Sequence, residues 1–386
     1  MDDLDARQRL ETDQLPALDR QIAACRVLGS PWTAAVLTVL RQDLADGGAT
    51  RDALADYRIP AHPSALALRL AGALNFLASA DDPDPRVASL AALHPSRRRD
   101  GHEAEDFADA VRHAMAARPD VLADFLERAV QTNEVQRSAV LAPGCLEIVA
   151  RTGLPLDLVE IGSSGGLNLL WDGFRFDLGG SRFGPEREQD IVRIAPDWQG
   201  APAPPAADAP IRSRRGVDIT PLDLRDPVVV ARGRAYVWPD QPRRLANFDA
   251  AVALLVESDV RVEQANASRW LPDVLAARAP GGCTVVMHSV MWQYMPPEDR
   301  QTAEAAIRAA GETATRERPL AWLRLEPRRD AVAMEVTLDL WPRAEDARRE
   351  RLAWSHPHGA VVRWLEAGSP DRFAQTPPFE ADFERR

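Results

Sequence analysis

The stretch that decides the fold is LDLVEIGSSGGLNLLWD, residues Leu156–Asp172. Its first part, Leu156–Ile161, is short and mostly apolar, contains β-branched residues, and lies between Pro155 and a glycine. Runs of this kind, bounded by residues that interrupt regular structure, are typical of buried strands. We therefore predict a strand here, with the carboxylate of Glu160 at its end.

Three glycines follow this strand at positions 162, 165 and 166, and Leu167–Trp171 then begins a helical pattern. A strand, a glycine-rich turn and a helix in this order form a nucleotide cradle, because glycine lets the backbone bend sharply and lets a ligand approach it. Free N–H groups at the start of the helix would point at that ligand. The carboxylate of Glu160 lies where it could meet the ligand's polar groups.

These residues resemble motif I of the class I S-adenosylmethionine-dependent methyltransferases, whose pattern is acidic-x-Gly-x-Gly-x-Gly. Ser164 takes the place of the middle glycine and is small enough to do so. The whole chain is also similar to a family of uncharacterised bacterial proteins, DUF2332. The resemblance implies S-adenosylmethionine as cofactor, bound by Glu160, Gly162, Ser163, Ser164, Gly165, Gly166 and Asn168.

Two later segments extend the resemblance. GVDITPLDL, residues 216–224, is similar to the second strand of these methyltransferases, in which an acidic residue accepts hydrogen bonds from the two ribose hydroxyls. The resemblance implies this role for Asp218, since a carboxylate offers two acceptor oxygens to a diol; a simple turn aspartate is the alternative. Asn266 and Ala267 stand where an acidic-alanine pair of the family meets the adenine amino group.

The order of the elements predicts two domains. Residues 1–135 show apolar spacings of three and four, which indicate an all-helical cap or lid domain. Residues 136–386 are expected to form a Rossmann-like, doubly wound α/β sheet of methyltransferase type, with an insertion at about 173–215 that contains a β-hairpin. The later strands are expected at Cys283–Met287, Leu320–Leu325, Val332–Trp341, Arg351–Ser355 and Ala360–Leu365.

Polar residues near the carboxyl ends of these strands are the candidates for substrate binding and catalysis, because ligands of doubly wound sheets bind there. His288 could accept a proton, since imidazole titrates near neutral pH, and Tyr294 and Glu134 are alternative bases. A buried histidine with satisfied hydrogen bonds is the competing interpretation of His288. Substrate contacts are expected from Asn133, Arg137 and Trp292, although the polar run 131–138 could also be a hydrophilic turn with a helix cap.

Composition narrows the chemistry further. The net charge is −11, and all 47 basic residues are arginine. Without lysine there is no P-loop lysine, Schiff base or lysine general base. An acidic chain lacks the clustered cations of nucleic-acid binders, and we interpret the short basic runs 97–99 and 212–215 as solvated loops.

No apolar run approaches the length of a membrane span, and the acidic N-terminus does not resemble a secretory signal. We therefore expect a cytoplasmic protein with no membrane partner. The three cysteines, Cys25, Cys145 and Cys283, are widely separated and odd in number, which favours buried thiols over a disulfide framework. We expect no metal site, and the sequence carries no signal for the oligomeric state.

Three functions remain open at this point. We expect S-adenosylmethionine-dependent methyl transfer to a small molecule, because a helical cap and an insertion favour an enclosed acceptor. The second is a serine hydrolase, since GSSGG also fits the G-x-S-x-G nucleophile elbow, with Ser164 as nucleophile and Asp339 and His356 as examples of its partners. The third is a binding protein that keeps the fold without catalysis.

Overall fold

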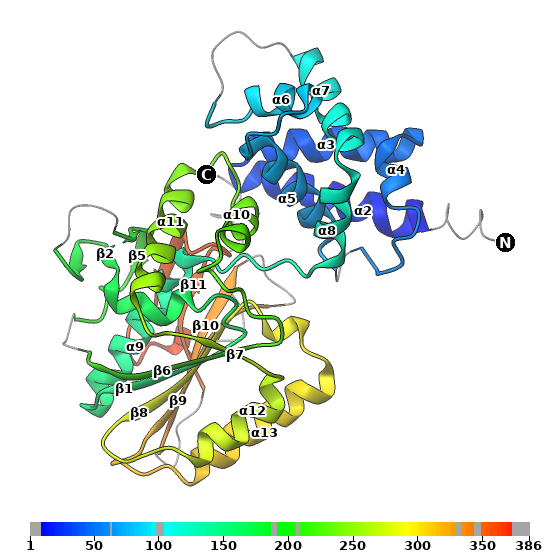
Figure 1. Ribbon diagram of the computed structural model, residues 1–386. Coiled ribbons are helices and arrows are strands. Elements are labelled where there is room, and N and C mark those ends of the chain that lie inside the picture. The colour runs from blue at the N-terminus through cyan, green and yellow to red at the C-terminus, as the bar shows by residue number, and fades with distance from the viewer. Residues whose placement is uncertain are drawn as a thin grey trace. The chain divides into compact units, whose positions relative to one another are not determined.

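The computed structural model describes residues 9–61, 64–97, 104–186, 191–205, 209–328, 333–342 and 349–372 (Figure 1). The chain forms two compact units. One unit consists of Met1–Thr132 together with Asp226–Leu245, and the other of Asn133–Arg225 together with Ala246–Arg386. The first unit thus includes a segment, Asp226–Leu245, that lies within the predicted second domain, residues 136–386.

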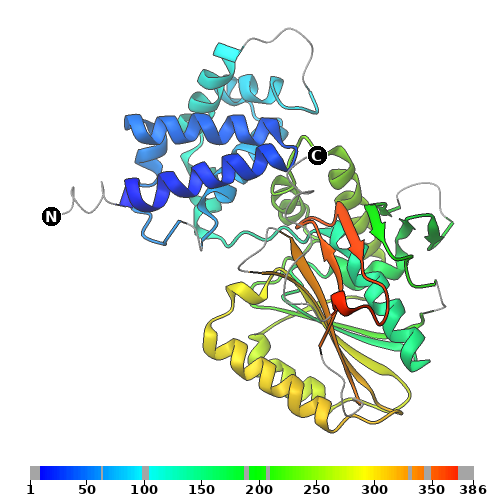
Figure 2. The same cartoon turned by 180° about the vertical axis from the view of Figure 1, so that it is seen from behind.

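The first unit is helical, as its apolar spacing predicts. Its central helix, α5, is buried along almost its whole length, and α2 and α3 lie side by side (Figure 2). Gly72 in α5 is required by packing, because a Cβ there would lie 2.7 Å from the ring of Tyr236. The helices are α2 (Leu15–Val27), α3 (Pro31–Asp46), α4 (Ala49–Ala53), α5 (Leu66–Ser79), α6 (Pro85–Ala92), α7 (Ala104–Ala117), α8 (Pro119–Glu127) and α10 (Pro227–Ala235).

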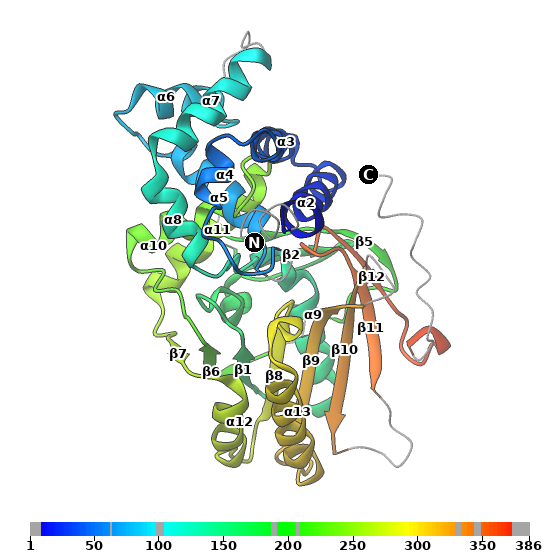
Figure 3. The same cartoon turned by 90° about the vertical axis from the view of Figure 1, so that its right-hand side faces the viewer.

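The second unit is built on a nine-stranded sheet with the order β5-β12-β11-β10-β9-β8-β1-β6-β7 (Figure 3). Strands β7, β6, β1, β8 and β9 are parallel, and β9, β10, β11 and β12 continue as an antiparallel run. Strand β1 has the bounds predicted from the sequence. The strands are β1 (Leu156–Ile161), β5 (Asp197–Gly200), β6 (Ile211–Asp218), β7 (Val262–Gln264), β8 (Cys283–Ser289), β9 (Leu320–Pro327), β10 (Met334–Trp341), β11 (Glu350–Ser355) and β12 (Val361–Trp364).

Helices cover both faces of this sheet. Helix α9 (Ser138–Thr152) packs on one face, where Gly144 lies so close to Leu323 of β9 that a Cβ would be 2.7 Å away. Helices α12 (Ala267–Ala276) and α13 (Pro297–Glu312) pack on the other face, where Trp322 is part of an apolar core (Figure 3). Helix α11 (Pro242–Glu257) precedes β7 in the chain. The expected α/β class is confirmed.

The segment predicted as an insertion forms a small sheet of its own, with the order β3-β2-β4. Its strands are β2 (Arg175–Leu178), β3 (Ser181–Phe183) and β4 (Arg193–Ile194), and β2 and β3 form the predicted hairpin. Strand β5, from the same segment, joins the main sheet beside β12.

The basic run 212–215, predicted to be a solvated loop, lies instead in β6. Each arginine of this run forms an ion pair with an acidic side chain. The pairs are Arg212 with Asp157, Arg214 with Asp172, and Arg215 with Glu263. Two residues of the other basic run, 98 and 99, lie outside the described residues.

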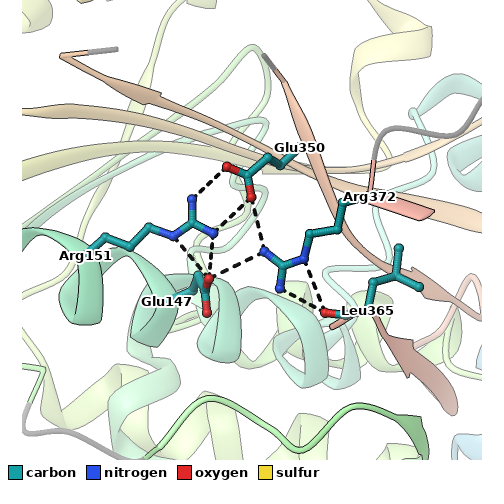
Figure 4. A network of polar contacts seen from close by, with 5 residues as sticks. All are labelled: Glu147, Arg151, Glu350, Leu365 and Arg372. Carbon is teal, nitrogen blue, oxygen red and sulfur yellow. Dashed lines mark hydrogen bonds and ion pairs between the residues drawn. The ribbon is translucent and has the colours of Figure 1, made fainter. Parts of the chain in front are cut away.

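A polar network joins the last described segment to the sheet unit (Figure 4). Arg372, which is 2% exposed, donates to Glu350 of β11 at 3.1 Å and to the carbonyl of Leu365 at 2.9 Å. Arg151 of α9 donates to the same Glu350 carboxylate at 2.9 and 3.0 Å and to Glu147 at 2.6 Å. Two arginines shared between two glutamates therefore hold α9, β11 and the segment around Arg372 together.

Candidate functional site

The strand order identifies one edge of the sheet as the place for a ligand. Numbered by their succession in the chain, the parallel strands have the order 3-2-1-4-5, and the order reverses between β1 and β8. Open α/β sheets bind ligands outside the carboxyl ends of their strands at such a switch point. The predicted residues Glu160, Asp218, Asn266 and His288 all lie at or next to carboxyl ends of these strands.

The glycine loop after β1 is closed by hydrogen bonds within the protein. Ser164 donates its N–H to Asp218 Oδ2 at 2.9 Å, and Asn133 Oδ1 accepts the N–H groups of Gly165 and Leu167 at 3.1 and 3.2 Å. The N–H groups of Gly162 and Ser163 both donate to Val217 O, and that of Gly166 to Ser163 O. All six N–H groups from 162 to 167 therefore have protein acceptors.

This arrangement corrects the expectation that free N–H groups face the ligand. The expected helix is a 3-10 helix, η3 (Leu167–Gly173), interrupted at Leu170, and not an α-helix. Protein side chains also occupy the space beside the loop glycines. A Cβ at Gly162 would lie 2.7 Å from the side chain of Met291, and a Cβ at Gly165 would lie 2.3 Å from that of Leu224. The polar groups beside the loop are instead the carboxyl groups of Glu160 on β1 and Asp218 on β6.

Glu160 is the more buried of these acceptors, with 2% of its surface exposed. Its Oε2 atom accepts no hydrogen bond from any described residue. Burial, together with the nearby carboxylate of Asp218, raises the pKa of Glu160 to about 8, although the Ser163 hydroxyl and Arg137 act in the opposite direction. A buried acceptor without a donor costs about 1–3 kcal/mol, so Glu160 is suited to receive a donor from a ligand.

Asp218 stands at the end of β6 and is half-buried. Besides Ser164, its carboxylate accepts the N–H of Thr220 at 2.9 Å, so it is fixed in orientation between two backbone donors. Ile219 next to it is 70% exposed, which leaves a large apolar side chain beside the carboxylate. A polar anchor beside an apolar surface is suited to a ribose joined to a flat base.

The segment before α9, residues 133–137, holds the glycine loop in place through hydrogen bonds. Asn133 caps the loop as described, Glu134 accepts the N–H of Gln136 at 3.0 Å, and both are buried. Asn168 is buried as well, where it donates to Glu134 O at 3.3 Å and accepts from the Ser138 hydroxyl at 2.9 Å. Asn168 thus holds the loop to its support.

Arg137 connects this segment to the end of β8 and to the turn between β11 and β12. Its guanidinium donates to the carbonyls of Pro357 and Ser289, both at 3.3 Å. Asn266 caps α12: its Oδ1 accepts from the N–H of Ser268 at 2.9 Å, and its Nδ2 donates to Asp299 at 3.0 Å. The carbonyl predicted to meet an adenine amine is therefore already in use, and Ala267 is the first residue of α12.

His288 is fully buried and has both ring nitrogens occupied. Trp322 Nε1 donates to His288 Nε2 at 3.1 Å, so the ring carries its proton on Nδ1, which donates to Glu326 Oε1 at 2.7 Å. Burial also lowers the pKa of His288, so the ring is neutral. In this arrangement both ring nitrogens are engaged within the protein, and the Nδ1–H holds the Glu326 carboxylate in place. The role of His288 as base stays a prediction.

Comparison with known proteins identifies the family. The sequence profile of the family described as "Uncharacterized protein conserved in bacteria (DUF2332)" matches residues 16–364. The chain belongs to this family. No curated protein matches it in a sequence search.

In this member of the DUF2332 family, backbone strain gathers at the same edge of the sheet. Among the described residues, the non-glycine residues with positive φ are Ala65, Asn133, Ser164 and Val290, and the last three lie beside the strand ends. Such conformations cost about 1–3 kcal/mol each and cluster at functional sites. The φ of 53° at the β-branched Val290 is the least expected of them.

The turn after Val290 carries the remaining predicted residues. Trp292 stacks on His288 with ring centroids 4.9 Å apart, and Tyr294 is 64% exposed. The N–H groups of Met291 and Trp292 donate to Glu326 Oε1 at 3.1 and 3.2 Å. Sequence reasoning missed Glu326, and its only signal was a position at the end of a predicted strand.

The residues of the hydrolase alternative are spread across the sheet. Asp339 lies on β10, which is separated from β1 by β8 and β9, or roughly 14 Å at the usual strand spacing. Its carboxylate pairs with Arg324 and Arg349. His356 follows β11, one strand further, and its Nδ1 accepts the N–H of His358 at 3.1 Å.

Among the described residues, no group of three or more histidine, cysteine, aspartate or glutamate side chains could hold a metal ion. Cys25, Cys145 and Cys283 are buried free thiols, as predicted. Within the same part of the chain, no helix is both long enough and apolar enough to cross a membrane.

Proposed function

We propose that the sheet unit binds S-adenosylmethionine across the carboxyl ends of β1 and β6 and directs its methyl group to a small-molecule acceptor. The observation that carries the proposal is the chemical character of the loop. All its N–H groups are used within the protein, whereas Glu160 and Asp218 present carboxylate oxygens at the same edge.

A ligand matched to this edge must supply hydrogen-bond donors. Nucleotides that bind through their phosphates need the free N–H groups that this loop lacks. S-adenosylmethionine has no phosphate, but carries an ammonium group and two ribose hydroxyls. In the proposal Glu160 accepts from the ammonium group, Asp218 accepts from the hydroxyls, and the exposed side chain of Ile219 covers the base.

The chemistry that the cofactor supplies is a methyl group already activated by a sulfonium. The protein then needs to orient a nucleophile in line with that group and exclude water. Trp292 and Tyr294 lie on the neighbouring turn after β8, where they would contact an acceptor.

Calorimetric titration of the full chain with S-adenosylmethionine, S-adenosylhomocysteine, ATP and NAD tests this function. Binding of the first two without ATP or NAD is expected, because only the phosphate-bearing ligands depend on free loop N–H groups. Binding of ATP or NAD in preference to the sulfur compounds would reverse the proposal, as would binding of none of the four.

A serine hydrolase is the second candidate, and one observation favours it. Ser164 has a φ of 55°, and a strained serine between a strand and a helical turn is the hallmark of the nucleophile elbow. The test is hydrolysis of p-nitrophenyl acetate by the wild type and Ser164→Ala. Hydrolysis that disappears in the variant would favour the hydrolase over the methyltransferase.

A further inference from the structure

We propose that Glu326 binds the methyl acceptor, and that this acceptor is a small molecule with a protonated amine. The transfer step rests on the proposed function above. The cation-binding part stands independently on the geometry of Glu326 and its neighbours.

The two carboxylate oxygens of Glu326 differ in their surroundings. Oε1 accepts three hydrogen bonds, from His288 Nδ1 at 2.7 Å, Met291 N at 3.1 Å and Trp292 N at 3.2 Å. Oε2 is buried and accepts none from any described residue. The carboxylate is therefore held in a fixed orientation, with one oxygen prepared for a donor that the described chain does not supply.

The missing donor is best supplied by a cation. The donors on Oε1 are all neutral, because the Trp322 hydrogen bond keeps His288 Nε2 unprotonated. Among the described residues, no arginine forms an ion pair with Glu326, and its close partner is the neutral ring of His288. A buried carboxylate oxygen that has no donor among the described residues favours a charged donor, which forms hydrogen bonds about twice as strong as a neutral one.

The surroundings of Glu326 suit an ammonium group on an apolar body. Met291, Trp292 and Met295 are partly buried apolar side chains packed against the core on this face of the sheet. Trp292 and the exposed Tyr294 provide aromatic rings, whose faces attract cations. The positive φ of Val290 places backbone strain at the start of this turn, next to the N–H groups that hold Glu326.

Glu326 would also prepare the amine for transfer. Its Oε2 takes one proton from the ammonium group and leaves a neutral amine with a lone pair. The amine nitrogen then uses that pair to bond to the methyl carbon, while the bond from that carbon to sulfur breaks and the sulfur keeps its electrons. The products are a methylated ammonium ion, S-adenosylhomocysteine and a protonated Glu326.

The test measures charge preference with three matched probes: 2-phenylethylamine, 2-phenylethanol and phenylacetate. Each is titrated into the wild-type full chain at pH 7, with and without S-adenosylhomocysteine. We expect the amine to bind at least ten-fold tighter than the alcohol, and the anion least. Glu326→Gln keeps the shape of the side chain and should reduce the preference at least ten-fold, whereas Glu312→Gln, on the exposed end of α13, should retain it.

Equal affinity of the wild type for amine and alcohol, or no measurable binding of the amine, would overturn the proposal. So would an undiminished preference in Glu326→Gln. If that variant does not fold, the preference of the wild type decides. Binding of S-adenosylhomocysteine is measured in the same samples. If the protein prefers the amine but does not bind S-adenosylhomocysteine, methyl transfer is rejected and the cation site at Glu326 is supported.

Discussion

The N–H of Ser164 donates to Asp218 Oδ2 at 2.9 Å, which ties the glycine loop after β1 to the end of the neighbouring strand β6. The same carboxylate holds the N–H of Thr220. Asp218 is thereby fixed before any ligand arrives, and a preorganised acceptor loses less entropy on binding. Loop and carboxylate act as one structural element.

Replacement of Asp218 is therefore expected to weaken cofactor binding, and the loss should be larger when both carboxylate oxygens are removed than when one is kept. Asp218→Asn keeps one acceptor oxygen and should lower the affinity for S-adenosylhomocysteine about 10-fold, whereas Asp218→Ala should lower it about 100-fold or more, at roughly 1.5–3 kcal/mol for each charged hydrogen bond. Calorimetry measures both affinities. Asp223→Ala, on the same loop but capping only Arg225, is the matched control and should bind like the wild type. Equal loss in all three variants would count against a specific role for Asp218.

Glu160 should make the stability of the protein fall as the pH rises. Its pKa is raised from 4.5 to about 8 in the folded state by burial. The folded protein therefore keeps a proton that the unfolded chain releases between these two values, and the penalty grows over that range. Relative to Glu160→Gln, the wild type should lose roughly 3 kcal/mol of unfolding free energy between pH 4.5 and pH 7. Urea titrations at several pH values measure this difference, and a difference that does not change with pH would contradict the assignment.

The Trp322–His288–Glu326 chain should behave as a structural unit. His288→Leu leaves the Trp322 N–H without an acceptor and removes a donor from Glu326, so we expect a loss of about 2–4 kcal/mol. Because burial lowers the pKa of His288, its contribution is present above about pH 6.5 and is lost as the pH falls toward the folded value. Denaturation at pH 7.5 and pH 5.5 tests this. His288→Gln, which can still donate and accept, should recover most of the stability but lose the pH dependence.

The network in Figure 4 should contribute to stability without affecting ligands. Arg372→Ala leaves Glu350 and the carbonyl of Leu365 with fewer donors in a mostly buried place, so we expect a loss of about 2–3 kcal/mol. Arg316→Ala, at an exposed arginine, should cost less than about 0.5 kcal/mol. Unfolding curves measure both. Unchanged stability in Arg372→Ala would show that Arg151 alone holds the two glutamates.

Local sequence patterns predict much of the sheet. Leu156–Ile161 is a strand with the predicted bounds, because an apolar run between proline and glycine has few other structures open to it. The arginine-rich run 212–215 has no apolar pattern that predicts a strand, yet it lies in β6. Its arginines are tolerated in a strand because acidic partners on neighbouring segments pair with them, and those partners are distant in the sequence.

The site was less predictable than the strands. Asn133 was singled out from its polar run. Its role as acceptor for the N–H groups of Gly165 and Leu167 depends on tertiary structure, because these residues lie more than 30 positions further along the chain. Glu326 was not singled out, because its neighbours His288 and Trp292 reach it only through the pairing of β8 with β9. Acceptors contributed by tertiary structure have no local pattern.

The most direct test of the central claim is proton release on cofactor binding. Calorimetric titration of the full chain with S-adenosylmethionine at pH 7, in two buffers of different ionisation enthalpy, counts the protons released. If the ammonium group of the ligand pairs with Glu160, the carboxyl must ionise, and the wild type should release close to one proton, as expected for a pKa of about 8. Glu160→Gln should bind more weakly and release none. Tight binding with no proton release, or no binding by the wild type, would contradict the account.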